Sequence, residues 1–344
     1  MKRARTETAV AKLQGALLAF YREHGRDLPW RKSRDPYEIW ISEVMLQQTQ
    51  VQTVVPRFAG FLRQFPDVRA LAGARESTVC EAWAGLGYYR RARNLHKAAV
   101  VIAGELGGEV PLNEAALRRL PGIGDYTAAA IASIAFGERA AAVDGNVVRV
   151  LARLFALPGR VDKPDLVRAV RAKARELVDC EHPGDVNQAL MDVGAMLCRP
   201  TAPACPRCPL RRWCHARREG APESYPGKKA KTARKILRVA FAFIERGPSL
   251  LLEQRPLAGL WAGLWELPSA SGARAKKDLG LRLGQPPGPV MAHVSHELTH
   301  RHVLVTVYRA TAKAQSGQRW WRDPLAAPLS SLARKAIMAA RGGP

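Results

Sequence analysis

Four of the chain's six cysteines lie close together in residues 198–214, which read CRPTAPACPRCPLRRWC. They follow the spacing C-x6-C-x2-C-x5-C, at Cys198, Cys205, Cys208 and Cys214. Four thiolates suit either a structural zinc ion or an iron–sulfur cluster, and the spacing alone does not separate the two. The other two cysteines, Cys80 and Cys180, stand alone in helical patterns and are predicted to be packing residues.

Two carboxyl groups in different surroundings are the next candidates for chemistry. Glu43 lies in IWISEVMLQQTQ, where apolar residues at helical spacing predict a buried helix. A buried, unpaired carboxyl group stays protonated and can act as a general acid, whereas an edge-exposed glutamate is the alternative. Asp144, in VDGNVVRV, follows an apolar residue in a turn-forming triplet. Its alternative role is an Asx-turn or the N-cap of the following helix.

A tight turn lies between two predicted helices in LPGIGDYTAAAI, residues 120–131. Gly122 and Gly124 keep side chains away from the turn, so free backbone N–H groups can approach a phosphate oxygen. The spacing predicts a helix–hairpin–helix over 113–136, with an ordinary helical corner as the alternative. Such a turn would grip a nucleic-acid backbone without reading its sequence.

The elements that must position these residues divide the chain into two domains. Residues 1–216 read as closely spaced helices, including one from Pro36 with Asp35 as its N-cap and one that ends at Gly137. Residues 217–236 are basic, rich in Pro and Gly, and without periodicity, which predicts a linker. From 237 to 344 two alternating stretches and a terminal helical pattern predict a smaller α+β domain.

The formal net charge of +24 is spread through this foldable sequence, which favours a polyanionic partner such as nucleic acid. No stretch approaches the ~18 uncharged residues of a membrane helix, so no membrane partner is predicted. Lys12 interrupts the basic start MKRARTETAVAK before an apolar region forms. We therefore expect no signal peptide and a cytoplasmic, bacterial-type location.

In combination these motifs resemble the MutY-type adenine DNA glycosylases of the helix–hairpin–helix superfamily, with endonuclease III as close kin. The resemblance covers about residues 8–215 and is carried by LPWR, SEVMLQQTQV, GLGYYRRARNLH, LPGIGDYTA, VDGNVVRVLAR, NQALMDVGAMLC and the cysteine stretch. It continues more weakly through LLLEQRPLAGLWAGLWELP and HVSHELTHRHVL, which look like the family's Nudix-like recognition domain. The implied fold is a helical glycosylase domain with an iron–sulfur loop, followed by this smaller domain.

The resemblance implies a role for each candidate residue. The four clustered cysteines would hold a [4Fe–4S] cluster, Glu43 would be the acid, Asp144 the stabilising carboxylate and Asn146 a group on the sugar or water. Tyr126 occupies the position of a lysine nucleophile in the lyase relatives, which implies a monofunctional enzyme. Tyr88 resembles the wedge that enters the DNA stack. The other implied contacts are Gln48 in the gap, Arg31 and Gln188 on adenine, Trp30 and Leu46 in its pocket, and Gly122, Gly124, Arg207, Arg211 and Arg212 on the DNA backbone.

The implied activity is removal of adenine opposite 8-oxoguanine or guanine in double-stranded DNA, by a monomer. Ser295 and His296 match the family's lesion-reading pair, but Val294 replaces an aromatic residue that is usual there. One rival reading is a Nudix hydrolase, although the sequence after GLWELP lacks a glutamate cluster. The other is a DNA-binding module without catalysis, which would require the loss of Glu43 or Asp144.

Overall fold

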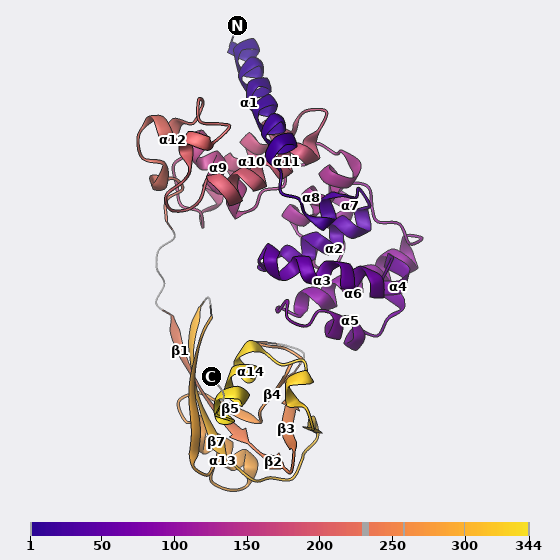
Figure 1. Ribbon diagram of the computed structural model, residues 1–344, viewed down its shortest axis with the longest axis vertical. Helices are drawn as coiled ribbons and strands as arrows, with labels where there is room; N and C mark the ends of the chain where they lie inside the picture. The colour runs from indigo at the N-terminus through magenta and orange to yellow at the C-terminus, as the bar shows by residue number, and fades with distance from the viewer. Residues whose placement is uncertain (1, 229–233, 257–258, 299, 343–344) are drawn as a thin grey trace. The chain divides into compact units, whose positions relative to one another are not determined.

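The computed structural model describes residues 2–228, 234–256, 259–298 and 300–342 (Figure 1). The chain divides into two compact units. The helical unit comprises Met1–Val79 with Arg91–Ala230, and the mixed unit comprises Cys80–Arg90 with Lys231–Pro344. None of the helices in the described ranges is both long and apolar enough to cross a membrane.

Helices supply the regular structure of the first part of the chain, as the sequence predicts. They are α1 (Lys2–His24), α2 (Pro36–Leu46), α3 (Val51–Gln64), α4 (Val68–Gly73), α5 (Glu76–Ala82), α6 (Arg90–Glu105), α7 (Glu114–Leu117), α8 (Asp125–Phe136), α9 (Gly145–Leu154), α10 (Pro164–Val178), α11 (Pro183–Asp192) and α12 (His215–Arg218). Short 3₁₀ turns are η1 (Pro29–Arg31), η3 (Cys205–Arg207) and η4 (Pro222–Ser224). The segment η2 (Val193–Leu197) is π-helical and directly continues α11.

Local signals in the sequence place several helix ends. The Asp35 carboxylate accepts a hydrogen bond from the Tyr37 amide at 2.7 Å, which caps α2 as predicted. Gly137 ends α8 with a left-handed φ of 69°, the conformation that glycine adopts at least cost. These caps mark the start of α2 and the end of α8, and the two helices pack against each other.

The helix–hairpin–helix predicted over 113–136 is formed by α7 and α8. Gly122 has a φ of 80°, and a Cβ atom there would lie 2.6 Å from the Asn94 Cβ, so glycine is required by both conformation and space. Gly124 instead has an extended backbone and is the N-cap of α8. The turn is therefore tight because of Gly122, whereas Gly124 leaves the start of α8 open.

The mixed unit contains two four-stranded sheets, in agreement with the predicted α+β class. Its elements are β1 (Lys235–Phe243), β2 (Glu245–Arg246), β3 (Ser249–Gln254), β4 (Trp265–Glu266), β5 (Ser269–Ser271), β6 (Val290–Glu297), β7 (Arg301–Arg309), β8 (Gln318–Trp321), η5 (Pro324–Ala326), α13 (Ala275–Leu283) and α14 (Ser331–Ala340). One sheet has the order β5-β1-β7-β6, with β1 and β7 parallel. The other has the order β2-β3-β4, and β8 also pairs with β3, in the antiparallel direction.

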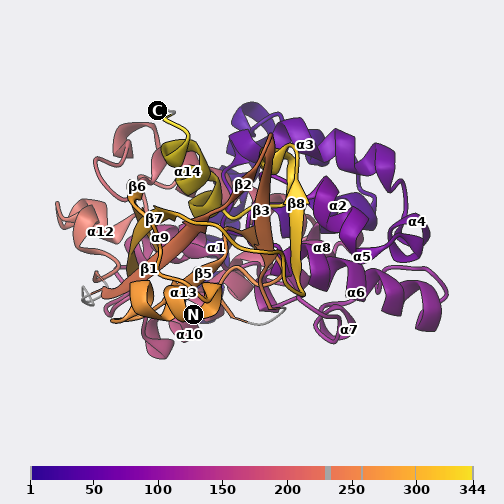
Figure 2. The same cartoon turned by 90° about the horizontal axis from the view of Figure 1, so that it is seen from below.

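Alternation along β1 and β7 explains how the two helices cover the first sheet. Val239, Phe241 and Phe243 share a core cluster with the α14 side chains, and the valines of β7 join them as predicted. Ala240 and Ala242, on the opposite face, pack toward α13. Figure 2 shows α14 and α13 on the two sides of this sheet.

The predicted linker 217–236 is partly folded. Its first half forms the end of α12 and the turn η4, and the Arg153 Nε donates to the Tyr225 carbonyl at 2.9 Å. Gly227 then pairs with Arg160 in an isolated bridge. The stretch that joins the units is therefore shorter than the sequence predicts, and residues 229–233 of the predicted linker lie outside the described ranges.

Candidate active site and cysteine pocket

Glu43 is buried at the centre of α2, as its apolar neighbours predict. The residue is only 5% exposed, and its Oε2 atom has no hydrogen-bond partner among the described residues. Burial raises the pKa of Glu43 to about 7, and the nearby Asp144 charge adds to the rise, whereas Tyr126 and Arg31 oppose it. The carboxyl group can therefore carry a proton near neutral pH, as a general acid must.

Tyr126 lies in the first turn of α8, beside both carboxyl groups. Burial raises the pKa of its phenol well above the ordinary value, and the charges of Glu43 and Asp144 reinforce that effect. Its hydroxyl donates to the Met191 Sδ at 3.6 Å. Tyr126 thus stays neutral and can donate a hydrogen bond toward Glu43.

Asp144 is the N-cap of α9, so the structural role that the sequence left open is real. Its Oδ1 accepts from the Val147 amide at 2.7 Å, and its Oδ2 accepts from the Asn146 Nδ2 at 2.8 Å. In both contacts the partner donates the hydrogen bond, as expected for a carboxylate, which accepts hydrogen bonds and does not donate them. The cap holds Asp144 in one place near Glu43 and Tyr126, and it does not preclude a role in charge stabilisation.

A buried ion cluster lies near Glu43. Asp192, at the end of α11, is fully buried and accepts from the Arg31 guanidinium at 2.6 and 2.9 Å. It also accepts from the Arg26 amide at 3.0 Å and from the Arg26 Nε at 2.6 Å. Arg31 is therefore held in a two-pronged contact, and its charge still reaches Glu43.

The other residues assigned to the adenine pocket are mostly enclosed. Trp30 is 6% exposed and meets the Phe58 ring edge-on at 5.4 Å between centroids. Gln188 is 8% exposed on α11, and Leu46, at the end of α2, is half-buried. All belong to the helical unit, and their contact with adenine stays a prediction.

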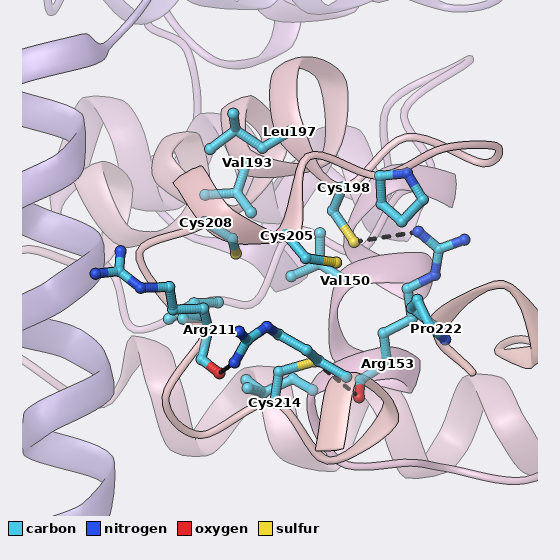
Figure 3. A pocket seen from close by; sticks show the side chains of 14 residues that line it. Val150, Arg153, Val193, Leu197, Cys198, Cys205, Cys208, Arg211, Cys214 and Pro222 are labelled. Atoms are coloured by element: carbon cyan, nitrogen blue, oxygen red, sulfur yellow. Dashed lines mark hydrogen bonds between the residues drawn. The ribbon is translucent and has the colours of Figure 1, made fainter. Parts of the chain in front are cut away.

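The four clustered cysteines line a single pocket, together with valine, leucine and proline side chains and with Arg153, Arg211 and Arg217 (Figure 3). The space between its atoms is about 410 Å³, with the solvent at its open side included, and Val150, Val193, Leu197 and Leu210 are among the other residues that line it. Burial raises the pKa of Cys208 to about 12, and the neighbouring cysteines add to the rise. Burial likewise raises the pKa of Cys214.

These features test whether the pocket suits a metal cluster. Four thiolates in an apolar cavity need a compensating positive charge, because otherwise burial keeps them protonated. Within the described ranges no three candidate side chains converge closely enough to hold a single metal ion. Four cysteine side chains around one shared space are the ligand set that holds an iron–sulfur cluster in proteins.

Helix α9 connects the cysteine pocket to the candidate carboxylate. Arg149 donates to the Asn146 Oδ1 at 2.7 Å and, through Nε, to the Cys198 carbonyl at 2.7 Å. Arg153, one turn later, donates to the Arg199 carbonyl at 2.7 Å and reaches the Cys198 Sγ at 3.5 Å. Gly194, in η2, lets this segment lie close to the start of α9, because a Cβ atom at residue 194 would be only 2.6 Å from the Asn146 Cβ.

Two residues assigned to the DNA stack have an unusual backbone. Gln48 is exposed, with a φ of 56°, and Tyr88 is 59% exposed, with a φ of 47°. Left-handed conformations are uncommon outside glycine and concentrate at functional sites. Sequence reasoning selected both residues but gave no sign of this conformation.

The arginines assigned to the DNA backbone lie on the surface of the cysteine loop. Arg207, Arg211 and Arg212 are all exposed. The loop backbone around them is ordered by local turns, with the Arg211 amide donating to the Cys208 carbonyl at 3.1 Å. Their cationic groups are therefore presented to solvent by the loop that carries the four cysteines.

Ser295 and His296, the pair predicted to read the lesion, lie on opposite faces of β6. Ser295 is exposed, whereas His296 is half-buried, with its Nε2 3.5 Å from the Ser331 Oγ and its ring 6.3 Å from that of Trp261. Val294 is 6% exposed and belongs to the core cluster beneath α14. An aromatic residue at 294 would thus enter the core rather than lie beside Ser295.

The structure brings Glu43, Tyr126, Asp144 and Arg31 together, with Asn146 attached to Asp144. Sequence reasoning missed Asp192 and Arg149, although both stand inside motifs that it used, NQALMDVGAMLC and VDGNVVRVLAR. An acidic residue in an otherwise apolar helical stretch was the available signal for Asp192.

Comparisons with known proteins agree with this geometry. Residues 41–179 match the HhH-GPD superfamily of base excision DNA repair proteins, and 239–339 match the NUDIX domain. The adenine DNA glycosylase of Homo sapiens is 36% identical over 372 aligned residues, which cover 90% of this chain and 68% of that protein. A solved thermostable thymine-DNA glycosylase is 31% identical, with a TM-score of 0.56 over 62% of this chain and 99% of that one. An endonuclease III in a complex with DNA, at 24% identity and a TM-score of 0.53, shares the helical fold over 62% of this chain and 97% of that one. The chain therefore belongs to the MutY-type adenine DNA glycosylases.

Proposed function

We propose that the protein hydrolyses the bond between adenine and deoxyribose in double-stranded DNA and leaves an abasic site. The observation that carries the proposal is the buried Glu43 carboxyl group, with a pKa raised to about 7, beside the capped carboxylate of Asp144. Two carboxyl groups in unlike environments are the arrangement used to cleave glycosidic bonds. The family membership supports adenine as the base.

Each carboxyl group has a distinct task in this reaction. Adenine leaves poorly as an anion, so Glu43 donates its proton to a ring nitrogen of the base. The sugar develops positive charge as the bond breaks, and the Asp144 carboxylate stabilises that charge. Asn146, bound to Asp144 at 2.8 Å, orients the carboxylate and can position the attacking water.

Tyr126 supports a monofunctional reaction. A Schiff base with the sugar requires an amine, and a phenol cannot form one. The neighbourhood of Tyr126 supplies two carboxyl groups and the Met191 thioether. We therefore expect the abasic strand to remain unbroken after adenine is released.

The basic surface and the exposed wedge residues support a duplex substrate. Adenine inside a duplex must be turned out of the stack before Glu43 can reach it, so a side chain has to fill the gap. Tyr88 and Gln48 are exposed and suit this task. The residues that would hold the DNA backbone without reading its sequence are Gly122, Gly124, Arg207, Arg211 and Arg212.

The opposite base is the finer part of the proposal. We propose that 8-oxoguanine is preferred over guanine and that Ser295, exposed on β6, contacts its edge. His296 would support the strand from the other face through Trp261 and Ser331. The match of 239–339 to the NUDIX domain is consistent with a recognition domain of this kind.

The apolar pocket supports a [4Fe–4S] cluster held by Cys198, Cys205, Cys208 and Cys214. When bound, the cluster would link the four cysteines covalently. All four of its ligands would then be cysteine thiolates of the protein. Arg149 and Arg153 then connect this tie to α9, which carries Asp144 at its start. The cysteines thus shape the loop that presents Arg207, Arg211 and Arg212.

Release of free adenine tests the proposal. Incubation with a duplex that contains adenine opposite 8-oxoguanine should release adenine, detected by chromatography, and leave a strand that breaks only after alkali. Borohydride should trap little covalent complex, whereas the Tyr126→Lys variant should be trapped more. Glu43→Gln should bind the same duplex and release no adenine. Adenine release by Glu43→Gln at the wild-type rate would contradict the assignment of the acid.

A further inference from the structure

The turn between α2 and α3 holds its middle residue in a fixed, exposed conformation. Gln48 has a left-handed φ of 56°, which a side chain other than glycine adopts only when its surroundings impose it. On one side, the Gln47 Nε2 donates to the hydroxyl of Thr127, a buried residue of α8, at 3.1 Å. The Thr49 amide donates to the Leu46 carbonyl at 3.3 Å, which closes the turn.

Arg91 fixes the other side of this turn. Its residue is 9% exposed, in the first turn of α6. The Nη1 atom donates to the Val44 carbonyl at 2.9 Å and to the Met45 carbonyl at 2.8 Å, and Nη2 donates to the Thr49 Oγ1 at 2.8 Å. The guanidinium therefore bridges the end of α2 and the turn that follows it.

This arrangement satisfies groups that the helix itself leaves open. The last carbonyls of a helix have no intrahelical donor and carry partial negative charge, so a cation there is favourable. The planar fork of arginine reaches the carbonyls and the Thr49 hydroxyl at the same time, whereas a lysine ammonium presents no such fork. With Gln47 and Thr49 both tied inward, Gln48 projects to solvent at the tip of the turn, and Gln50, which is also exposed, is already the N-cap of α3.

We infer that Arg91, acting through Thr49, is a positioning residue that presents Gln48 to the DNA stack when adenine turns out. The inference rests on the proposed function and adds a residue that supports base extrusion rather than the chemical step. Because Gln48 has the strained conformation before any DNA binds, the turn is ready to fill the gap. Loss of the Arg91–Thr49 contact should then reduce the extruded population.

A simpler role for Arg91 would be general stabilisation of the helical unit. The two roles predict different results when a substitution of Thr49 is combined with a substitution of Gln48. If Thr49 acts through Gln48, its removal has no further effect once Gln48 has been truncated, because coupled residues are not additive. If Thr49 only stabilises the fold, its effect persists in the truncated background.

The test is a double-mutant cycle on base extrusion, made in the Glu43→Gln background so that the base is not removed. The full chain is mixed with a duplex that carries 2-aminopurine opposite 8-oxoguanine, and the fluorescence of the extruded base is measured at saturating protein. The variants are Thr49→Val, Gln48→Ala and both together. The matched control is Ser42→Ala, because the buried Ser42 hydroxyl donates to the Ile39 carbonyl of the same helix, at 2.8 Å, away from the turn.

We expect Thr49→Val to lower the extrusion equilibrium about tenfold, the size expected for a lost hydrogen bond to a charged group. Gln48→Ala should lower it as much, the double variant should be no worse than Gln48→Ala, and Ser42→Ala should leave it unchanged. Arg91→Lys should resemble Thr49→Val. Additive losses, or an equal loss in Ser42→Ala, would overturn the inference. Unchanged extrusion in Thr49→Val would do so too, while adenine release by the protein with its native Glu43 would leave the proposed function standing.

Discussion

Asp192 and Arg31 form a two-pronged ion pair at 2.6 and 2.9 Å, with the Asp192 side chain fully buried. Burial on its own raises the pKa of Asp192, but hydrogen bonds and charge from Arg31 and Arg26 outweigh it and hold that pKa below its ordinary value. The pair fixes Arg31, whose positive charge lowers the pKa of Glu43.

We predict that Asp192→Asn lowers the free energy of unfolding by about 3–5 kcal/mol, because it leaves two cations without their buried partner. Denaturant titration of the full chain measures this. Asp27→Asn is the control, since Asp27 pairs with Lys32 at 3.2 Å on the surface and its loss should cost at most about 1 kcal/mol. Equal effects of the two changes would show that the buried pair contributes no special stability.

The protonation of Glu43 sets the pH dependence of adenine release. The acid must be protonated to act, and its pKa is raised to about 7, so the single-turnover rate should fall about tenfold per pH unit above that value. Because the Tyr126 hydroxyl lowers the pKa of Glu43, Tyr126→Phe should move the fall to higher pH. A rate that falls already near pH 5, or a Tyr126→Phe profile displaced to lower pH, would disagree with this assignment.

Local signals let the sequence predict much of this site, and long-range contacts account for the rest. Asp35, Gly137 and the apolar surroundings of Glu43 could be read from neighbouring residues, and the structure confirms all three. The ion pair between Arg31 and Asp192 could not be read in this way, because 161 positions separate the two residues. No spacing rule connects residues so far apart, so their contact depends on how α11 packs in the folded unit.

The mixed unit shows a second limit. Strand alternation placed Val239, Phe241 and Phe243 on one face, and the structure confirms that face. The same rule assigns Val294 to the core and Ser295 to the surface, whereas the family resemblance treated the two as neighbours in one recognition site. In β6, the alternation of side chains between the two faces of the strand decides where each side chain lies more directly than the resemblance to the family's motif does.

Val294→Phe should therefore destabilise the protein without increasing lesion preference. The larger ring enters a filled core and should cost about 1–3 kcal/mol of unfolding free energy. Ser295→Ala, on the exposed face, should instead reduce the preference for 8-oxoguanine over guanine by about tenfold, because it removes one polar contact to a base edge. Thermal unfolding and single-turnover rates on the two mispairs separate these effects. A stable Val294→Phe with stronger lesion preference would place residue 294 at the DNA.

The arginines of the cysteine loop should determine part of the salt dependence of binding. Replacing Arg207, Arg211 and Arg212 by Ala should reduce the slope of log K against log salt by up to about 2.7, since each phosphate contact contributes about 0.9. Matched and mispaired duplexes should weaken alike. The control replaces the exposed Arg168 and the half-buried Lys173, which lie on α10 and are each paired with an acidic residue. A loss confined to the mispaired duplex would mean that the loop reads the lesion.

The most direct measurement compares single-turnover release of adenine from four duplexes, with adenine opposite 8-oxoguanine, guanine, cytosine or thymine. We predict rapid release opposite 8-oxoguanine, slower release opposite guanine and little opposite the two pyrimidines, with strand breakage only after alkali. Glu43→Gln, run in parallel, should release adenine from none of them. Equal rates on all four duplexes, or no adenine release opposite 8-oxoguanine, would contradict the function proposed for this protein.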